Sequence, residues 1–258
     1  MLLVGSENNK FKFNLILTVG DSYSDDGIDL IRGDLHGYQD YSDGKIPSLN
    51  FAYGGALSGR GNFHFNDQYS GVAWQVDQIL GSSNIDLEKS LVIYQSGGIN
   101  DIFAKIANHR QILDNNYQNL EKLFENGAKY VIVLDIFDFS RCPWYNSVEG
   151  FLSKGATQHI IQWINSQFEE DIVSRLQSEY PDRHLIHVKT YPVMDEIFEK
   201  FPNNTVEFKR MSGQRPQDRF SYAFFDSFHL CTGPHLLIAK RLNEKIRNYF
   251  QNSASSEE

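Results

Sequence analysis

The chain has few cysteines and no excess of basic residues. Its 258 residues include only Cys142 and Cys231, which is too few for a disulfide framework, although one long-range bridge stays open. A formal net charge of −9 argues against nucleic-acid binding, which needs a basic surface to displace counterions, and against attraction to anionic membranes. We therefore expect no nucleic-acid partner and predict a small neutral molecule as ligand. The composition leaves the oligomeric state open.

Long apolar runs are also missing. No stretch of about 18 apolar residues exists, so no transmembrane segment is predicted. The apolar stretch in the opening MLLVGSENNKFKF is too short for the hydrophobic region of a signal peptide. The expectation is a cytoplasmic protein, or a secreted one if the N-terminus is incomplete.

Apolar runs of strand length alternate with segments of helical period. The predicted strands are rich in Leu, Ile and Val, as in strands buried on both faces; they cover 15–19, 91–95, 130–136 and 184–188, with a short one within 49–55. Helical patterns cover 101–126, 160–176 and 234–250. This alternation predicts an α/β domain with a central parallel sheet, helices on both faces and ligands beyond the carboxyl ends of the strands.

Two common ligand-binding loops do not fit the segment after the first strand, GDSYSDDG, which begins at Gly20. Aligned as an EF-hand, it would place Ser22 and Ser24 at the first and third ligand positions and Gly33 at the twelfth. A phosphate-binding spacing of glycines is missing as well. The sequence thus predicts no metal and no nucleotide cofactor.

A serine nucleophile explains this segment better. A turn after the strand would expose the hydroxyl of Ser22. Asp226 and His229 are three residues apart, so the carboxylate can hold imidazole Nδ1–H and leave Nε2 facing the serine. Gly55 and Asn100 follow predicted strands and can donate hydrogen bonds to an oxyanion.

The stretches that carry these residues resemble the sequence blocks of the GDSL-type branch of the SGNH hydrolase superfamily. They read GDSYSDDG with Ser22, NFAYGGA with Gly55, GGIND with Asn100, and FFDSFHL with Asp226 and His229. Order and intervals match over essentially the whole chain. The second and last blocks look most like fungal and plant GDSL esterases, although Leu230 stands where those relatives often have proline.

The resemblance implies a three-layer α/β/α sandwich of flavodoxin-like type, as one domain over 1–250, followed by a disordered tail over 251–258. It implies ester hydrolysis by Ser22, His229 and Asp226 without cofactor or metal. The oxyanion hole would comprise the N–H groups of Ser22 and Gly55 and the side chain of Asn100. The expected substrate is a small ester with a short acyl group, such as an acetylated carbohydrate.

Other functions stay open. The chain could act on longer acyl chains as a lipase or phospholipase, since the loops 57–71 and 203–221 are rich in aromatic and polar residues. It could be a catalytically weak relative that binds carbohydrate. It could also be a metal-dependent phosphohydrolase, which EDTA would inhibit.

Structural roles are the alternative for single residues. Ser22 or Asn100 could cap a helix, with Asp101 as a further candidate cap. Asp21 is expected to bond to loop amides. We expect acidic residues 25 and 26 in a first helical turn, and the histidines at 184, 187 and 235 as ordinary sheet or helix residues.

Overall fold

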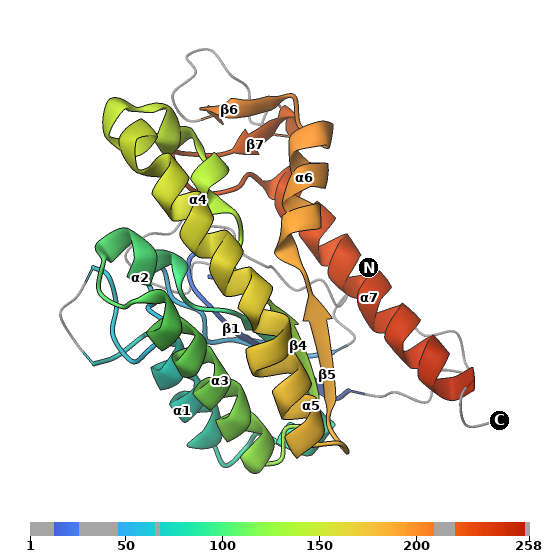
Figure 1. The fold of residues 1–258 in the computed structure, drawn as a ribbon. Coiled ribbons are helices and arrows are strands. Elements are labelled where there is room, and N and C mark those ends of the chain that lie inside the picture. Colours follow the sequence, from blue (N-terminus) through green and yellow to red (C-terminus); the bar gives the residue numbers. More distant parts are fainter. Residues whose placement is uncertain (1–12, 26–45, 65–67, 209–219, 256–258) are drawn as a thin grey trace.

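The computed structural model describes residues 13–25, 46–64, 68–208 and 220–255, with side chains as far as Gln251. Five parallel strands form the central sheet in the order β2-β1-β3-β4-β5 (Figure 1). The strands are β1 (Leu15–Val19), β2 (Ser48–Asn50), β3 (Ser90–Gln95), β4 (Tyr130–Leu134) and β5 (His184–Val188). This is the flavodoxin-like strand order, so the predicted fold class is confirmed.

Helices cover the sheet as two layers (Figure 1). In one layer, α1 (Val72–Leu80) packs against α3 (His109–Glu125), and α3 packs against α4 (Val148–Phe168). In the other, α7 (Thr232–Ser255) packs against β5 and α6 (Thr190–Lys200). The shorter helices are η1 (Leu87–Lys89), α2 (Ile99–Ala104), η2 (Phe139–Arg141), η3 (Pro143–Asn146), η4 (Glu169–Ser174) and α5 (Arg175–Glu179).

Three predicted helices have other bounds than expected. The segment 101–126 is two helices, because Lys105 adopts a left-handed conformation after α2 and the Asn108 side chain then accepts from Gln111 N to cap α3. The helix predicted from 160 begins earlier, at Val148, and continues through the π-helical turn η4 into α5. The last helix reaches Ser255, five residues into the segment expected to be a tail.

The register of the sheet brings the expected loops together. Within β1, Thr18 pairs with Asn50 of β2 on one side and with Ile93 of β3 on the other. The chain therefore leaves β1, β2 and β3 at the same edge. A separate parallel pair, β6 (Asn203–Glu207) and β7 (Tyr222–Phe224), leads into α7. Among the described residues, no helix is both long and apolar enough to cross a membrane.

Candidate active site

The turn that carries Ser22 is anchored at its base. Gly20 N–H donates to Gln75 Oε1 and Gln75 Nε2 donates to Gly20 O, each at 2.8 Å. Asp21 O then accepts from the backbone N–H groups of residues 24 and 25, both at 3.0 Å. Ser22 therefore stands on a single tight bend directly after β1, and its side chain is half-buried.

Asp21 lies buried behind the turn. Its Oδ1 accepts from Tyr23 N at 3.0 Å and from Gln95 Nε2 at 2.7 Å. Burial raises the pKa of Asp21 to about 6. These two hydrogen bonds and the positive charge of His229 lower the pKa, but burial has the larger effect. The expected bond to a loop amide is confirmed by the Tyr23 contact.

The carboxylate of Asp25 joins the Ser22 turn to the next loop. Asp25 Oδ2 accepts from Gly54 N at 2.7 Å. The prediction that Asp25 lies in a first helical turn is wrong, because the residue is in a loop and its side chain is buried. Asp26 lies outside the described residues. With Gly54 N–H engaged, the N–H of Gly55 has no hydrogen bond to any described residue, as an oxyanion donor requires.

Glycine is the one residue type that fits position 55. Its φ is +79°, which other residues rarely adopt. A Cβ there would lie 2.5 Å from His64 Cδ2 and 2.7 Å from Asn62 Oδ1. The carbonyl of Gly55 accepts from Phe63 N at 2.7 Å. The loop is thus closed over by residues 62–64, which the sequence motif does not include.

Asn100 reaches this loop from the start of α2. Its Nδ2 donates to Ala56 O at 2.9 Å, which leaves a second amide hydrogen on the same nitrogen. Neither Asn100 nor Asp101 caps α2, because the N-cap residue is Gly98. Asp101 instead accepts from Ser58 N (2.8 Å) and Ser58 Oγ (2.9 Å).

His229 and Asp226 form the expected pair after β7. His229 Nδ1 lies 2.9 Å from both carboxylate oxygens of Asp226, and Oδ1 also accepts from the backbone N–H groups of Phe228 and His229. Burial alone would raise the pKa of Asp226, but the hydrogen bond and charge of His229 and the two amides hold it below its usual range. The carboxylate is therefore ionised at neutral pH.

The Ser22 turn and the His229 loop are neighbours. The ring centroids of Tyr23 and His229 are 6.4 Å apart, and Tyr23 Oη donates to Phe228 O at 2.8 Å. Within the described part of the chain, no hydrogen bond links Ser22 Oγ to His229 Nε2. The structure brings the predicted residues to one sheet edge, and neither Ser22 Oγ nor His229 Nε2 is bonded to a described residue.

An aromatic wall, formed by Phe63, Phe103, Trp144 and Phe228, borders this edge. The Phe228 centroid lies 5.8 Å from that of Trp144 and 5.3 Å from that of Phe103, and Phe63 lies 5.8 Å from Phe103. The wall runs from the residue before His229 to the loop over Gly55. The sequence motifs point to its members only indirectly: one precedes His229 and another lies one helical turn after Asn100.

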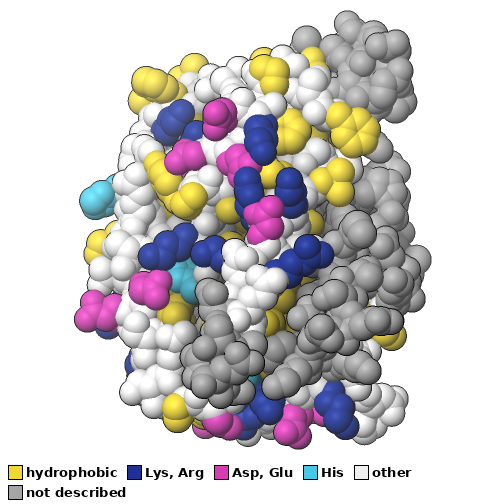
Figure 2. All heavy atoms as spheres, turned by 90° about the vertical axis from the view of Figure 1, so that its right-hand side faces the viewer, with side chains coloured by type: hydrophobic (Ala, Val, Ile, Leu, Met, Phe, Trp, Pro, Cys, Tyr) yellow, Lys and Arg dark blue, Asp and Glu magenta, His cyan; other side chains and the backbone are white. Residues whose placement is uncertain are grey.

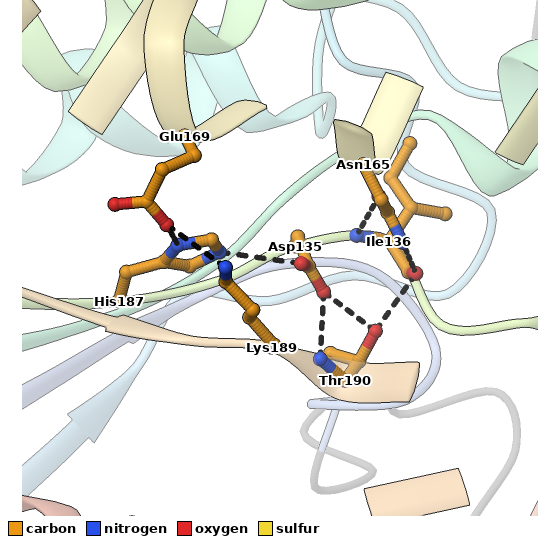
Figure 3. Close-up of polar contacts among 7 residues, drawn as sticks. All are labelled: Asp135, Ile136, Asn165, Glu169, His187, Lys189 and Thr190. Carbon is orange, nitrogen blue, oxygen red and sulfur yellow. Dashed lines mark hydrogen bonds and ion pairs between the residues drawn. The ribbon is translucent and has the colours of Figure 1, made fainter. Parts of the chain in front are cut away.

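A second histidine–carboxylate cluster lies between β4, β5 and η4 (Figure 3). His187 Nδ1 is 2.9 Å from Glu169 Oε2, and His187 Nε2 is 3.2 Å from Asp135 Oδ2. Asp135 Oδ1 also accepts from the N–H and hydroxyl of Thr190 (2.7 and 2.6 Å), where α6 begins. The expectation that His187 is an ordinary sheet residue misses this cluster, since its partners are far away in the sequence.

The cluster borders a groove of about 740 Å³ that is lined by β5, η4, α6 and α7 and includes none of the predicted site residues. The molecular face that contains α6 and α7 carries basic and acidic side chains beside one another (Figure 2). Several are ion-paired, as Glu196 is with Lys200 and Arg241. The described residues that line the groove therefore include both acidic and basic side chains.

Two further expectations concern cysteines and metals. Cys142 and Cys231 are both buried and neither is in a disulfide, so the optional bridge is not formed. Burial raises the pKa of Cys142 to about 12, so the thiol is protonated at neutral pH. Among the residues that the structure describes, no group of three or more His, Cys, Asp or Glu side chains is arranged to hold a metal ion.

Comparison with known proteins shows the fold. No family model matches the sequence, and no curated protein matches it. A solved member of the lipolytic protein G-D-S-L family from Veillonella parvula has a TM-score of 0.55 at 14% identity, covering 89% of this chain and 96% of its own. A variant of an acetyl-xylooligosaccharide esterase from Geobacillus stearothermophilus has a TM-score of 0.54 at 12% identity, covering 92% and 95%. The chain has the α/β fold of these two proteins.

Proposed function

We propose that the chain is a serine esterase that hydrolyses carboxylic esters through an acyl-enzyme. One observation carries the proposal: Asp226 holds His229 through Nδ1, while Nε2 of His229 has no bond to a described residue. The loop that contains His229 is hydrogen-bonded to the Ser22 turn. Nδ1–H bound to the carboxylate fixes the tautomer in which Nε2 is a base.

The proposed reaction has two halves. Nε2 of His229 takes the proton of Ser22 Oγ as the oxygen attacks the ester carbonyl, and Asp226 stabilises the imidazolium. The N–H groups of Ser22 and Gly55 and the Nδ2 of Asn100 donate to the oxyanion. The imidazolium then protonates the leaving alcohol. Water attacks the acyl-enzyme with His229 as base again, which releases the carboxylic acid and restores Ser22.

The decisive test is Ser22→Ala with p-nitrophenyl acetate as substrate. Loss of a triad nucleophile lowers kcat about 10⁶-fold in a comparable serine hydrolase, and we expect a loss of that order here. The matched control is Ser166→Ala on the exposed side of α4, which should keep full activity. Labelling of wild type, but not Ser22→Ala, by a fluorophosphonate would support the nucleophile. Near-normal hydrolysis by Ser22→Ala would refute the proposal.

For the substrate, we propose short acyl esters such as acetylated carbohydrate, in the manner of fungal and plant GDSL esterases. The fold likeness to an acetyl-xylooligosaccharide esterase supports this choice. The aromatic wall favours a second candidate, an ester with a longer acyl chain, because Phe63, Phe103 and Phe228 carry no polar atom to bind sugar hydroxyls. Rates on p-nitrophenyl esters from acetate to palmitate would separate the two, with a maximum at acetate supporting the first.

A further inference from the structure

Tyr23 follows Ser22 directly, at the position where the family motif has leucine. Its ring is buried, with 4% of its surface exposed. The ring stacks on Phe137 at a centroid distance of 5.4 Å and an interplanar angle of 19°. Its N–H donates to Asp21 Oδ1. Both the backbone and the ring of Tyr23 are therefore held in place, so that the hydroxyl has little freedom to move.

That hydroxyl contacts the other half of the site. Tyr23 Oη donates to the carbonyl of Phe228 at 2.8 Å, across 205 residues of sequence. The N–H of Phe228 is held by Asp226 Oδ1 at 2.9 Å. The residue before His229 is thus fixed through its N–H from inside the loop and through its carbonyl by the residue after Ser22.

The hydroxyl of Tyr23 stays a hydrogen-bond donor at neutral pH. Burial raises the pKa of Tyr23 well above its ordinary value, and the neighbouring Cys142, Asp21 and Asp226 raise it further. The phenol keeps its proton over the whole range in which a histidine base works. A leucine at this position could pack against Phe137 but could not donate.

We propose that Tyr23 is a positioning residue that sets the approach of His229 to Ser22 through its hydrogen bond to Phe228. This inference rests on the proposed esterase function and extends it. The nucleophile and base come from opposite ends of the chain, and the bond lies one residue from each. Small displacements between reacting groups have large kinetic effects, because an error of about 1 Å can cost about 100-fold in rate.

The test compares Tyr23→Phe and Tyr23→Leu with wild type on p-nitrophenyl acetate. Both variants remove the hydroxyl, and the first keeps the ring on Phe137. We expect kcat to fall about 10- to 100-fold, with KM changed by less than about twofold, because the hydroxyl is turned toward Phe228 and not toward substrate. The control is Tyr145→Phe, which removes another buried hydroxyl, bonded to Thr157 Oγ1 at 3.1 Å, and should leave kcat unchanged.

A purely structural role for Tyr23 predicts a different pattern. It would lower the fraction of folded enzyme, and not kcat per active site. Saturating fluorophosphonate labelling counts the sites with a reactive Ser22, so kcat is expressed per labelled site. Unchanged kcat per site in either folded variant would overturn the inference.

Failure of the inference can be told apart from failure of the esterase proposal. If wild type neither hydrolyses p-nitrophenyl acetate nor is labelled, the esterase proposal fails, and this inference falls with it. If wild type is active and the variants match it, only the role of Tyr23 is refuted.

Discussion

Two histidines of this chain lie against aspartates, and the two arrangements differ in what each ring nitrogen does. His229 binds Asp226 through Nδ1 and keeps Nε2 for another partner, and 27% of its side chain is exposed. His187 lies between two carboxylates, with Glu169 on Nδ1 and Asp135 on Nε2, and only 6% of its side chain is exposed. Because carboxylates occupy both nitrogens of His187, neither nitrogen is available to a serine hydroxyl.

The surroundings of the two histidines differ as well. His229 faces the turn that presents a serine, and the His229 loop adjoins the aromatic wall. His187 joins the ends of β4 and β5 to the π-helical turn η4, and Asp135 continues the network to the first residue of α6 (Figure 3). An Asp–His contact alone therefore does not identify a catalytic site. What sets His229 apart is an Nε2 with no bond to a described residue and a serine in the neighbouring turn, and the proposed esterase function depends on both features.

The largest expected effect separates the two histidines by activity. His229→Ala should lower kcat on p-nitrophenyl acetate about 10⁶-fold, as loss of the triad base does in a comparable hydrolase. His187→Ala should leave kcat within about twofold. It should instead lower the free energy of unfolding by about 3 kcal/mol, because two carboxylates lose their shared partner.

Steady-state kinetics and denaturant unfolding of both variants check this pair. The stability loss should be at the lower end of the range for buried ion pairs, since the Glu169 side chain is 47% exposed and water can solvate it. A large loss of kcat in folded His187→Ala would make that cluster part of the reaction. If the His229→Ala variant were active, Nε2 of His229 could not be what distinguishes the two histidines in function.

An intermediate effect separates two asparagines in the same way. Asn100→Ala should lower kcat about 100- to 1,000-fold with KM nearly unchanged, since its second amide hydrogen is available to an oxyanion. Asn165→Ala, beside the His187 cluster, should cost only stability, about 1–2 kcal/mol. Its side chain already donates to Ile136 O (2.7 Å) and accepts from Ile136 N (3.1 Å). Equal kcat values for the two variants would contradict the assigned oxyanion role.

Local patterns allowed the sequence to predict much of this architecture. Nearly continuous apolar runs predicted the parallel strands, because strands buried on both faces leave no polar positions. The Asp226–His229 contact was predictable because both partners lie within one short loop. The sharp turn at Ser22 was predictable from its place directly after a strand.

Contacts between distant segments were not predictable in this way. Asp135 and Glu169 are 52 and 18 residues from His187, so no local spacing in the sequence brings these three side chains together. The break between α2 and α3 depends on the left-handed conformation of Lys105. A lysine in the sequence does not predict this conformation. The role of Asp25 toward Gly54 likewise required knowing that β1 and β2 are neighbours.

The smallest expected effect concerns the pH dependence of stability, through His187 and its neighbour on β5. Burial alone would lower the pKa of His187, but its bonds and charge interactions with Asp135 and Glu169 raise it above 6.5. Lys189 is the other charged group at the cluster, and it pairs with Glu169 at 3.4 Å. Since the folded state binds the proton more tightly, His187 contributes stability fully below about pH 6.5, and this contribution is lost as pH rises through the raised pKa.

The measurement compares the Tm of wild type with that of His187→Gln between about pH 5 and pH 9, a range that spans the titration of an ordinary histidine. The Tm of wild type should exceed that of His187→Gln by less as pH rises. Each 1 kcal/mol lost from the difference in unfolding free energy should lower the Tm difference by about 2–4 °C. His184 on the same strand is the matched control of opposite sign. Burial and then the charge of Lys129 lower its pKa, so wild type should lose stability relative to His184→Gln as pH falls below about 6.5. Parallel slopes for the two variants would mean that the carboxylates do not hold a proton on His187, and the contrast with His229 would then rest on exposure alone.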